Sequence, residues 1–142
     1  FNIIGGLVMP VLIERLRDLR PVPLILAATT AAGWIGVLVN ASAAPLIWAS
    51  LMGIGGMCFP LALALLAART REPAVTARLS GFVQPGGYLL AGGFPFIFGL
   101  VAQATGGWSV SLAVLIALTV AMAVAGVAAA RPVYIDDELL SK

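Results

Sequence analysis

Residues 79–130 read LSGFVQPGGYLLAGGFPFIFGLVAQATGGWSVSLAVLIALTVAMAVAGVAAA and contain no charged side chain. Residues 21–68 are also free of charge. A helix needs about 20 mainly apolar residues to cross a bilayer, so each stretch is long enough to cross twice. A soluble chain could not hide so much apolar length, because too little polar surface would remain to face water. The two stretches predict an all-α membrane protein.

The rest of the composition agrees with this class. Of the 142 residues, 61% are hydrophobic and 10% are charged, and the mean hydropathy is +1.08. The eight basic and six acidic residues fall into three clusters, at 14–20, 69–78 and 131–142. We interpret the net charge of +2 as basic residues that flank spans and fix their orientation, and expect no nucleic-acid partner.

The chain offers little of what catalysis or metal binding requires. Cys58 is the single cysteine and there is no histidine, so the sequence predicts neither an internal disulfide nor a metal site. It also lacks a nucleophile–base set and a phosphate-binding loop. We therefore expect a protein that is not an enzyme and that needs no cofactor.

Turn signals divide each apolar stretch into a helical hairpin. Asn40 and Pro45 interrupt the first stretch, and a Gly pair at 106–107 interrupts the second. Residues 1–13 are too short to cross, so we interpret them as the end of a helix and the chain as the C-terminal part of a longer protein. The predicted spans are about 22–40, 45–68, 78–103 and 108–130, with a tail at 131–142.

The charge clusters predict the orientation of these hairpins. Two crossings separate successive clusters, so all three clusters lie on one side of the membrane. Loops rich in Lys and Arg are cytoplasmic in such proteins, and one such residue at mid-membrane costs roughly 2.5–3.5 kcal/mol. We expect an integral protein of the bacterial plasma membrane, with charged loops and C-terminus in the cytoplasm.

Polar side chains are rare inside the predicted spans, and one group stands out. Ser80, Gln84 and Tyr88 recur every four residues and therefore share one face of a helix. Secondary transporters place their substrate sites near the membrane midplane, so we predict that this face lines a substrate cavity. The alternative is that these groups bind a neighbouring helix by hydrogen bonds.

Glycine and proline interrupt the two middle spans. Proline removes a backbone hydrogen bond and kinks a helix, and interrupted helices indicate a transport pathway. The alternative is a static kink. The residues predicted to act as kinks or gates are Gly55, Gly56, Pro60, Pro85 and Pro95.

The outer spans carry small residues at four-residue spacing, which favours close helix packing in lipid. Ala28, Ala32 and Gly36 form one such stripe, and we predict it to be a contact face. The other predicted contact stripe is Ala113, Ala117, Ala121, Ala125 and Ala129.

Three stretches resemble a known family. They are Gly55-Gly-Met-Cys-Phe-Pro60, Leu79-Ser-Gly-Phe-Val-Gln84-Pro-Gly-Gly-Tyr88 and Ala104-Thr-Gly-Gly-Trp108. These are similar to the last helices of the cyanate-permease-like and nitroimidazole-transporter-like branch of the major facilitator superfamily. The resemblance implies a twelve-helix fold in which residues 1–13 end helix eight and the four spans are helices nine to twelve. It also implies that helices ten and eleven border the central cavity.

The first charge cluster looks like the cytoplasmic loop signature of that superfamily. The matching residues are Arg15, Asp18 and Arg20, whereas Pro10 or Val11 stands where an acidic residue is often found.

We therefore expect a fragment of a secondary active transporter that moves a small polar or anionic solute by alternating access. Its partners would be the lipid bilayer, the solute and the missing N-terminal helices of the same protein. One alternative is a stand-alone four-helix exporter, although exporters of that size use a membrane-embedded carboxylate that this chain lacks. The other alternative is a non-transporting scaffold subunit.

Overall fold

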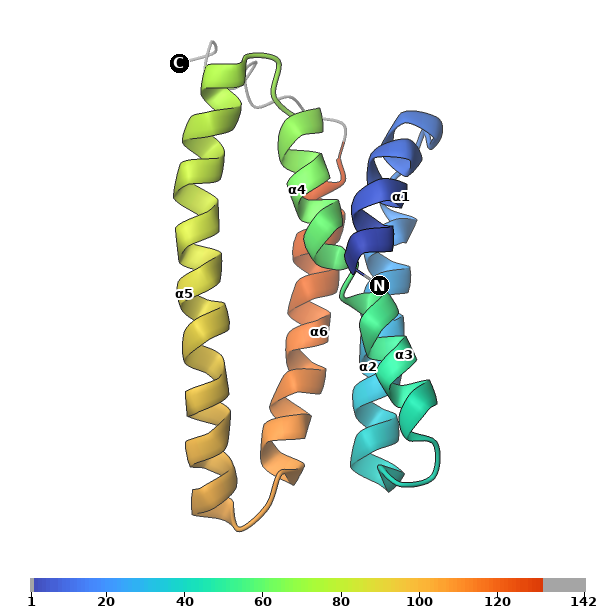
Figure 1. The fold of residues 1–142 in the computed structure, drawn as a ribbon, viewed down its shortest axis with the longest axis vertical. Coiled ribbons are helices and arrows are strands. Elements are labelled where there is room, and N and C mark those ends of the chain that lie inside the picture. The colour runs from blue at the N-terminus through green and yellow to red at the C-terminus, as the bar shows by residue number, and fades with distance from the viewer. Residues whose placement is uncertain (1, 132–142) are drawn as a thin grey trace. The chain divides into compact units, whose positions relative to one another are not determined.

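The computed structural model describes residues 2–131, and this range contains helices and turns but no strand. Four apolar segments are long enough to cross a membrane, namely α2, α3 together with α4, α5, and α6. The helices are α1 (Asn2–Arg15), α2 (Pro21–Asn40), α3 (Pro45–Gly55), α4 (Cys58–Ala68), α5 (Pro73–Thr105) and α6 (Ser109–Ala129) (Figure 1).

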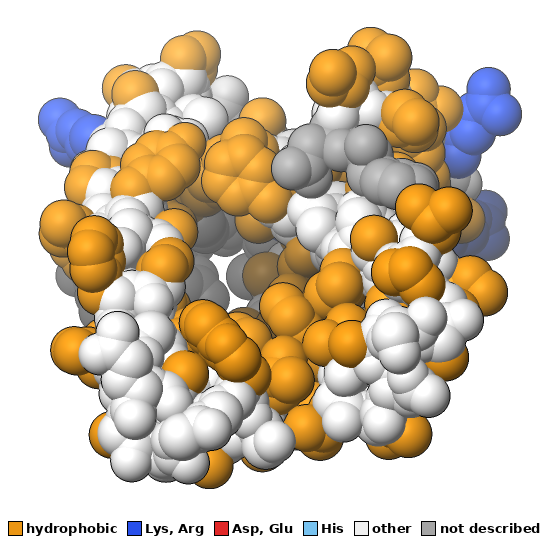
Figure 2. All heavy atoms as spheres, turned by 60° about the horizontal axis from the view of Figure 1, so that its bottom comes forward, with side chains coloured by type: hydrophobic (Ala, Val, Ile, Leu, Met, Phe, Trp, Pro, Cys, Tyr) orange, Lys and Arg blue, Asp and Glu red, His pale blue; other side chains and the backbone are white. Residues whose placement is uncertain are grey.

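Large apolar side chains lie on the outside of these helices. Ile3, Leu46 and Phe82 are 84%, 81% and 83% exposed. Apolar side chains make up much of the helix surface seen in Figure 2. A soluble monomer rarely exposes apolar surface on this scale. The predicted fold class, an all-α membrane protein, is confirmed.

The described chain divides into two compact units. The first comprises residues 2–65 and 112–131, and the second comprises Leu66–Ser111. The first unit has an apolar core to which α1, α2 and α4 contribute, together with Leu19 before α2 and Ala130 directly after α6. Its buried members are Met9, Leu19, Leu26, Leu61, Leu65 and Ala130.

Within the first unit, α2 and α3 lie side by side along a seam of glycines (Figure 1). A Cβ atom on Gly36 would meet the ring of Trp48, and one on Gly55 would meet the hydroxyl of Thr30. A Cβ on Gly33 would also collide with α3. Lipid gives no hydrophobic drive between helices, so this close approach lets dispersion contacts hold the pair together.

Among the described residues, Gly36 is the one member of the predicted contact stripes that packs in a helix seam, and contact of the others with a further helix stays a prediction. Gly36 does lie in the seam, but Ala28 and Ala32 are exposed, because the packed face of α2 runs through Leu26, Thr30 and Gly33 instead. The predicted stripe on α6 is exposed as well, and that helix contacts α2 through Gly126, where a Cβ would lie 2.5 Å from Pro23. Glycines that face a bulky partner determine these contacts, whereas the alanine spacing does not.

Helices α3 and α4 are separated at Gly56 and Met57, within the predicted span 45–68. Pro60 has no N–H to donate to the Gly56 carbonyl four residues earlier. That carbonyl accepts instead from the Phe59 N–H at 3.1 Å, a tighter three-residue bond. The proline therefore accounts for the interruption.

Helix α5 begins at Pro73, about five residues before the predicted start. Glu72 is extended (φ −98°, ψ 130°) and Pro73 occupies the first helical turn, where its fixed φ favours a helix. The helix then runs through Pro85 and Pro95 without interruption and stops at Gly106. Gly106 has φ 70°, a left-handed conformation that glycine adopts without strain.

Candidate solute-binding face

The structure places Ser80, Gln84 and Tyr88 on one uninterrupted helix, α5, so their four-residue spacing puts them on one face. Ser80 and Gln84 are half-buried, and Tyr88 is 58% exposed. At a rise of about 1.5 Å per residue, Gln84 lies roughly 9 Å and Tyr88 roughly 15 Å along the helix from Arg78. Tyr88 would thus lie near the middle of a hydrocarbon layer about 30 Å thick.

The two faces of α5 differ in more than these three residues. With about 100° between successive residues, one arc of about 140° collects the polar side chains and the prolines. All the large aliphatic side chains and phenylalanines between positions 79 and 97 project from the remaining arc. We name the first arc the polar face, and it contains Ser80, Gly81, Gln84, Pro85, Tyr88, Ala91, Gly92 and Pro95.

The glycines of the polar face border open space within their own unit. A Cβ atom on Gly81 or Gly92 would meet no heavy atom within 4 Å. Side chains from Leu66–Ser111 therefore leave the backbone open at these two glycines. A face with small residues beside amide and phenol groups could admit a small solute close to the backbone.

The other predicted kink residues lie in the first unit. Gly55 and Pro60 are buried at the junction of α3 and α4, and Gly56 lies between them on the chain. Gly55 packs against α2, whereas Pro60 packs against α1, since a Cβ on Gly5 would lie 2.8 Å from the Pro60 Cγ. Both sides of the junction are thus held by neighbouring helices, and a gating role remains a prediction.

The predicted loop signature is brought together only in part. The Arg20 N–H donates to the Asp18 Oδ1 at 3.0 Å, and the Arg20 Nε lies 4.0 Å from the same oxygen. Both side chains are more than half exposed, so this ion pair contributes little stability. Arg15 lies in the last turn of α1, where a cation favours the helix dipole.

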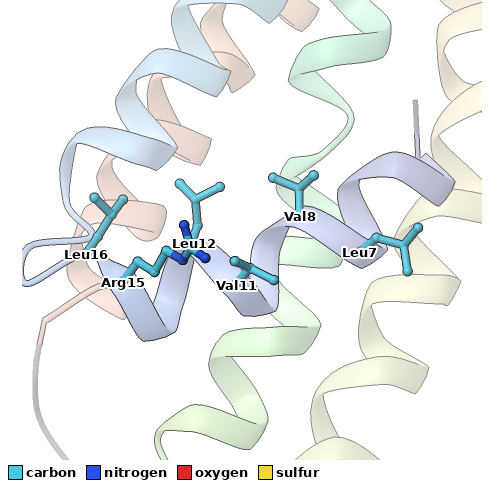
Figure 3. A pocket seen from close by; sticks show the side chains of 6 residues that line it. All are labelled: Leu7, Val8, Val11, Leu12, Arg15 and Leu16. Carbon is cyan, nitrogen blue, oxygen red and sulfur yellow. The ribbon is translucent and has the colours of Figure 1, made fainter.

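Arg15 also borders a depression of about 380 Å³ along α1 (Figure 3). Five of its six lining residues are aliphatic, four of them on α1 and Leu16 directly after it. The depression contains none of the predicted cavity residues. Its lining residues are Leu7, Val8, Val11, Leu12, Arg15 and Leu16.

Sequence reasoning missed a hydroxyl pair beside the second charge cluster. The Thr70 and Thr76 hydroxyls are hydrogen-bonded to each other, and Thr70 also donates to the Leu66 carbonyl at 3.0 Å. These bonds join the end of α4 to the first turn of α5. In the sequence, the only sign of this pair is that a threonine lies three residues before Pro73 and another lies three residues after it.

No group of three or more His, Cys, Asp or Glu side chains that could hold a metal ion occurs among residues 2–131. The described spans present apolar surface, and Ser80, Gln84 and Tyr88 lie on one face of α5. These features define an integral membrane protein, and a solute role for the polar face stays a prediction.

Comparison with known proteins identifies the relatives of this membrane protein. YycB, an uncharacterized transporter of Bacillus subtilis strain 168, is 37% identical over 128 residues, which cover 89% of this chain and 32% of YycB. The 2-nitroimidazole transporter of Escherichia coli K12 is 33% identical over 127 residues, again 89% of this chain and 32% of the relative. The cyanate transport protein CynX of the same organism is 30% identical over 105 residues, or 73% of this chain and 27% of CynX.

These similarities confirm the resemblance to the cyanate-permease-like and nitroimidazole-transporter-like branch of the major facilitator superfamily, and the chain is related to these transporters. The chain spans about a third of the length of the curated relatives it matches. No protein-family model matches the chain. No solved structure matches it either.

Proposed function

We propose that this chain forms part of a secondary transporter that moves a small polar or anionic solute by alternating access. The observation that carries this proposal is the polar face of α5, on which Ser80, Gln84 and Tyr88 interrupt an otherwise apolar span. Polar groups inside a membrane are costly and tend to be functional. No Asp, Glu, Lys or Arg lies between positions 79 and 130, so recognition on this face would use uncharged groups.

The names of the relatives support a small solute. One relative is named for 2-nitroimidazole and another for cyanate, and both are small molecules. These two relatives are named for different solutes, yet both are similar to this stretch of chain. This is consistent with a common solute pathway whose lining residues differ between them.

In the proposed cycle, two halves of the membrane domain rock about a site near the midplane. The junction at Gly55, Gly56 and Pro60 would let α3 and α4 change their angle, and Pro85 and Pro95 would weaken α5 at two points. The clusters at 14–20 and 69–78 would form contacts on the cytoplasmic side that open and close.

The test is uptake by the full-length protein that contains this stretch. Gln84→Ala should lower uptake without lowering the amount of protein in the membrane, because only the recognition group is lost. Gln103→Ala is the matched control, since Gln103 is exposed near the other end of α5 and should leave uptake unchanged. Equal uptake by Gln84→Ala and wild type would remove the polar face from the solute pathway.

A further inference from the structure

Gly92 continues the row of polar residues along α5 by one more turn. Ser80, Gln84, Tyr88 and Gly92 follow one another at four-residue spacing, and successive members of the row are about 40° apart around the helix. Gly92 lies roughly 6 Å further along the helix than Tyr88. Gly93, the next residue, lies about 140° away from Tyr88 around the helix, on the side of the large apolar side chains. The two neighbouring glycines therefore belong to different faces of one helix.

A side chain at position 92 would cover Tyr88. Side chains of a helix lean toward its N-terminus, so a residue covers the surface over the preceding turn. Glycine has no side chain to do this, and a Cβ placed on Gly92 would meet no heavy atom within 4 Å. Tyr88 itself is 58% exposed. Open space therefore lies next to Tyr88 within the unit Leu66–Ser111.

Two glycines of α2 show what a glycine does elsewhere in the spans of this chain. Gly36 receives the ring of Trp48, and Gly33 receives Met52, whose Cγ would lie 2.6 Å from a Cβ on that glycine. Glycine disfavours the interior of a helix, and at these two positions the close contact offsets that disadvantage. At Gly92 no group of its own unit takes up the room. On a face that carries amide and phenol groups, this room is available to a solute.

We propose that Gly92 determines the size of the solute that the polar face of α5 accepts, because it leaves room beside Tyr88 near the middle of the membrane. A larger residue at position 92 would narrow the pathway at Tyr88. A larger residue at position 93 would project from the other face and leave the pathway as it is. This proposal rests on the proposed transport function and adds a size limit to it.

The experiment measures how fast a thiol at position 88 reacts with methanethiosulfonate reagents in the full-length protein, which carries Tyr88→Cys and no other cysteine. The reagents are the aminoethyl compound and its bulkier trimethylammonium counterpart, which carry the same charge. With Gly92 in place, both should react quickly. Gly92→Leu should slow the bulkier reagent roughly tenfold, because added methylene groups fill the space that it must enter. Gly92→Ala adds one methyl group and favours the helix, so it should fold and slow the bulkier reagent less.

Gly93→Leu is the matched control, because it adds the same side chain one residue away, where a Cβ would also meet no heavy atom within 4 Å. It should leave both rates unchanged. Equal slowing by Gly92→Leu and Gly93→Leu, or no slowing by either Gly92 variant, would overturn this inference and leave the transport function standing. A thiol at Tyr88→Cys that reacts no faster than one at Phe82→Cys on the apolar face would reject the solute pathway itself, and this inference with it.

Discussion

The indole Nε1 of Trp48 donates a hydrogen bond to the backbone carbonyl of Asn40 at 3.1 Å. The bond joins the last residue of α2 to the first turn of α3, and the same ring lies over Gly36. The Asn40 side chain holds the turn itself, since its Oδ1 accepts from the Ala43 N–H at 3.1 Å. Side chains of this hairpin thus satisfy the polar groups of its tip and close its seam.

Trp48→Phe should destabilise this hairpin. The substitution removes the N–H donor and part of the ring that lies over Gly36, so we expect a loss of at least about 0.5–1.5 kcal/mol, the usual net value of one hydrogen bond. The measurement is the midpoint of denaturant unfolding of the full-length protein in micelles. Trp108→Phe is the control. Trp108 is 61% exposed, so the loss of its indole should lower the unfolding midpoint less. Equal midpoints for the two variants would contradict the role given to Trp48.

Gly36→Ala should destabilise the α2–α3 pair although alanine favours helices. A Cβ at Gly36 would meet the Trp48 ring, so the ring or the helix must move. At Gly6 a Cβ would meet nothing within 4 Å, and Gly6→Ala should gain up to about 1 kcal/mol from helix propensity. A lower unfolding midpoint for Gly36→Ala and a higher one for Gly6→Ala would support close packing of α2 against α3 at Gly36. A Gly36→Ala variant as stable as Gly6→Ala would exclude this close packing.

Labelling of single cysteines tests the orientation of the hairpins. In a Cys58→Ser background, Ser42→Cys at the α2–α3 tip should react with a membrane-impermeant thiol reagent added outside intact cells. Arg71→Cys in the second charge cluster should react only after the membrane is opened, because Lys- and Arg-rich loops stay in the cytoplasm. The reverse pattern would invert the proposed topology.

The fold class could be predicted from the sequence because charge and hydropathy report directly on the solvent. Residues 79–130 carry no charge, and lipid is the solvent in which such a segment is stable. The tail at 132–142 lies outside the described residues, so the part of the third cluster beyond Arg131 stays a prediction.

Packing was harder to predict, because it depends on which side chain fills each gap. Ala28 and Gly36 share a stripe in the sequence, yet only Gly36 receives the Trp48 ring. The start of α5 was placed too late because the charges at 69–78 suggested a loop. Charge near a membrane surface does not prevent a helix, and Pro73 begins one there.

The shared face of the three candidate residues was easier to predict than the packing. Ser80, Gln84 and Tyr88 needed only helical periodicity to be placed on one face, and α5 is a continuous helix through all three. The solute role of that face remains a proposal. It depends on which side chains of neighbouring helices lie opposite this face, and helical periodicity does not determine that.

The proposed solute pathway requires water to reach the polar face of α5. The most direct measurement is the reaction rate of single cysteines along α5 with a small hydrophilic thiol reagent, in the Cys58→Ser full-length protein. Ser80→Cys, Gln84→Cys and Tyr88→Cys should react quickly, because water reaches their face. Phe82→Cys, Leu89→Cys and Phe96→Cys should react slowly, because thiols that face lipid stay protonated. Equal rates on both faces, or faster reaction at the second set, would contradict the account.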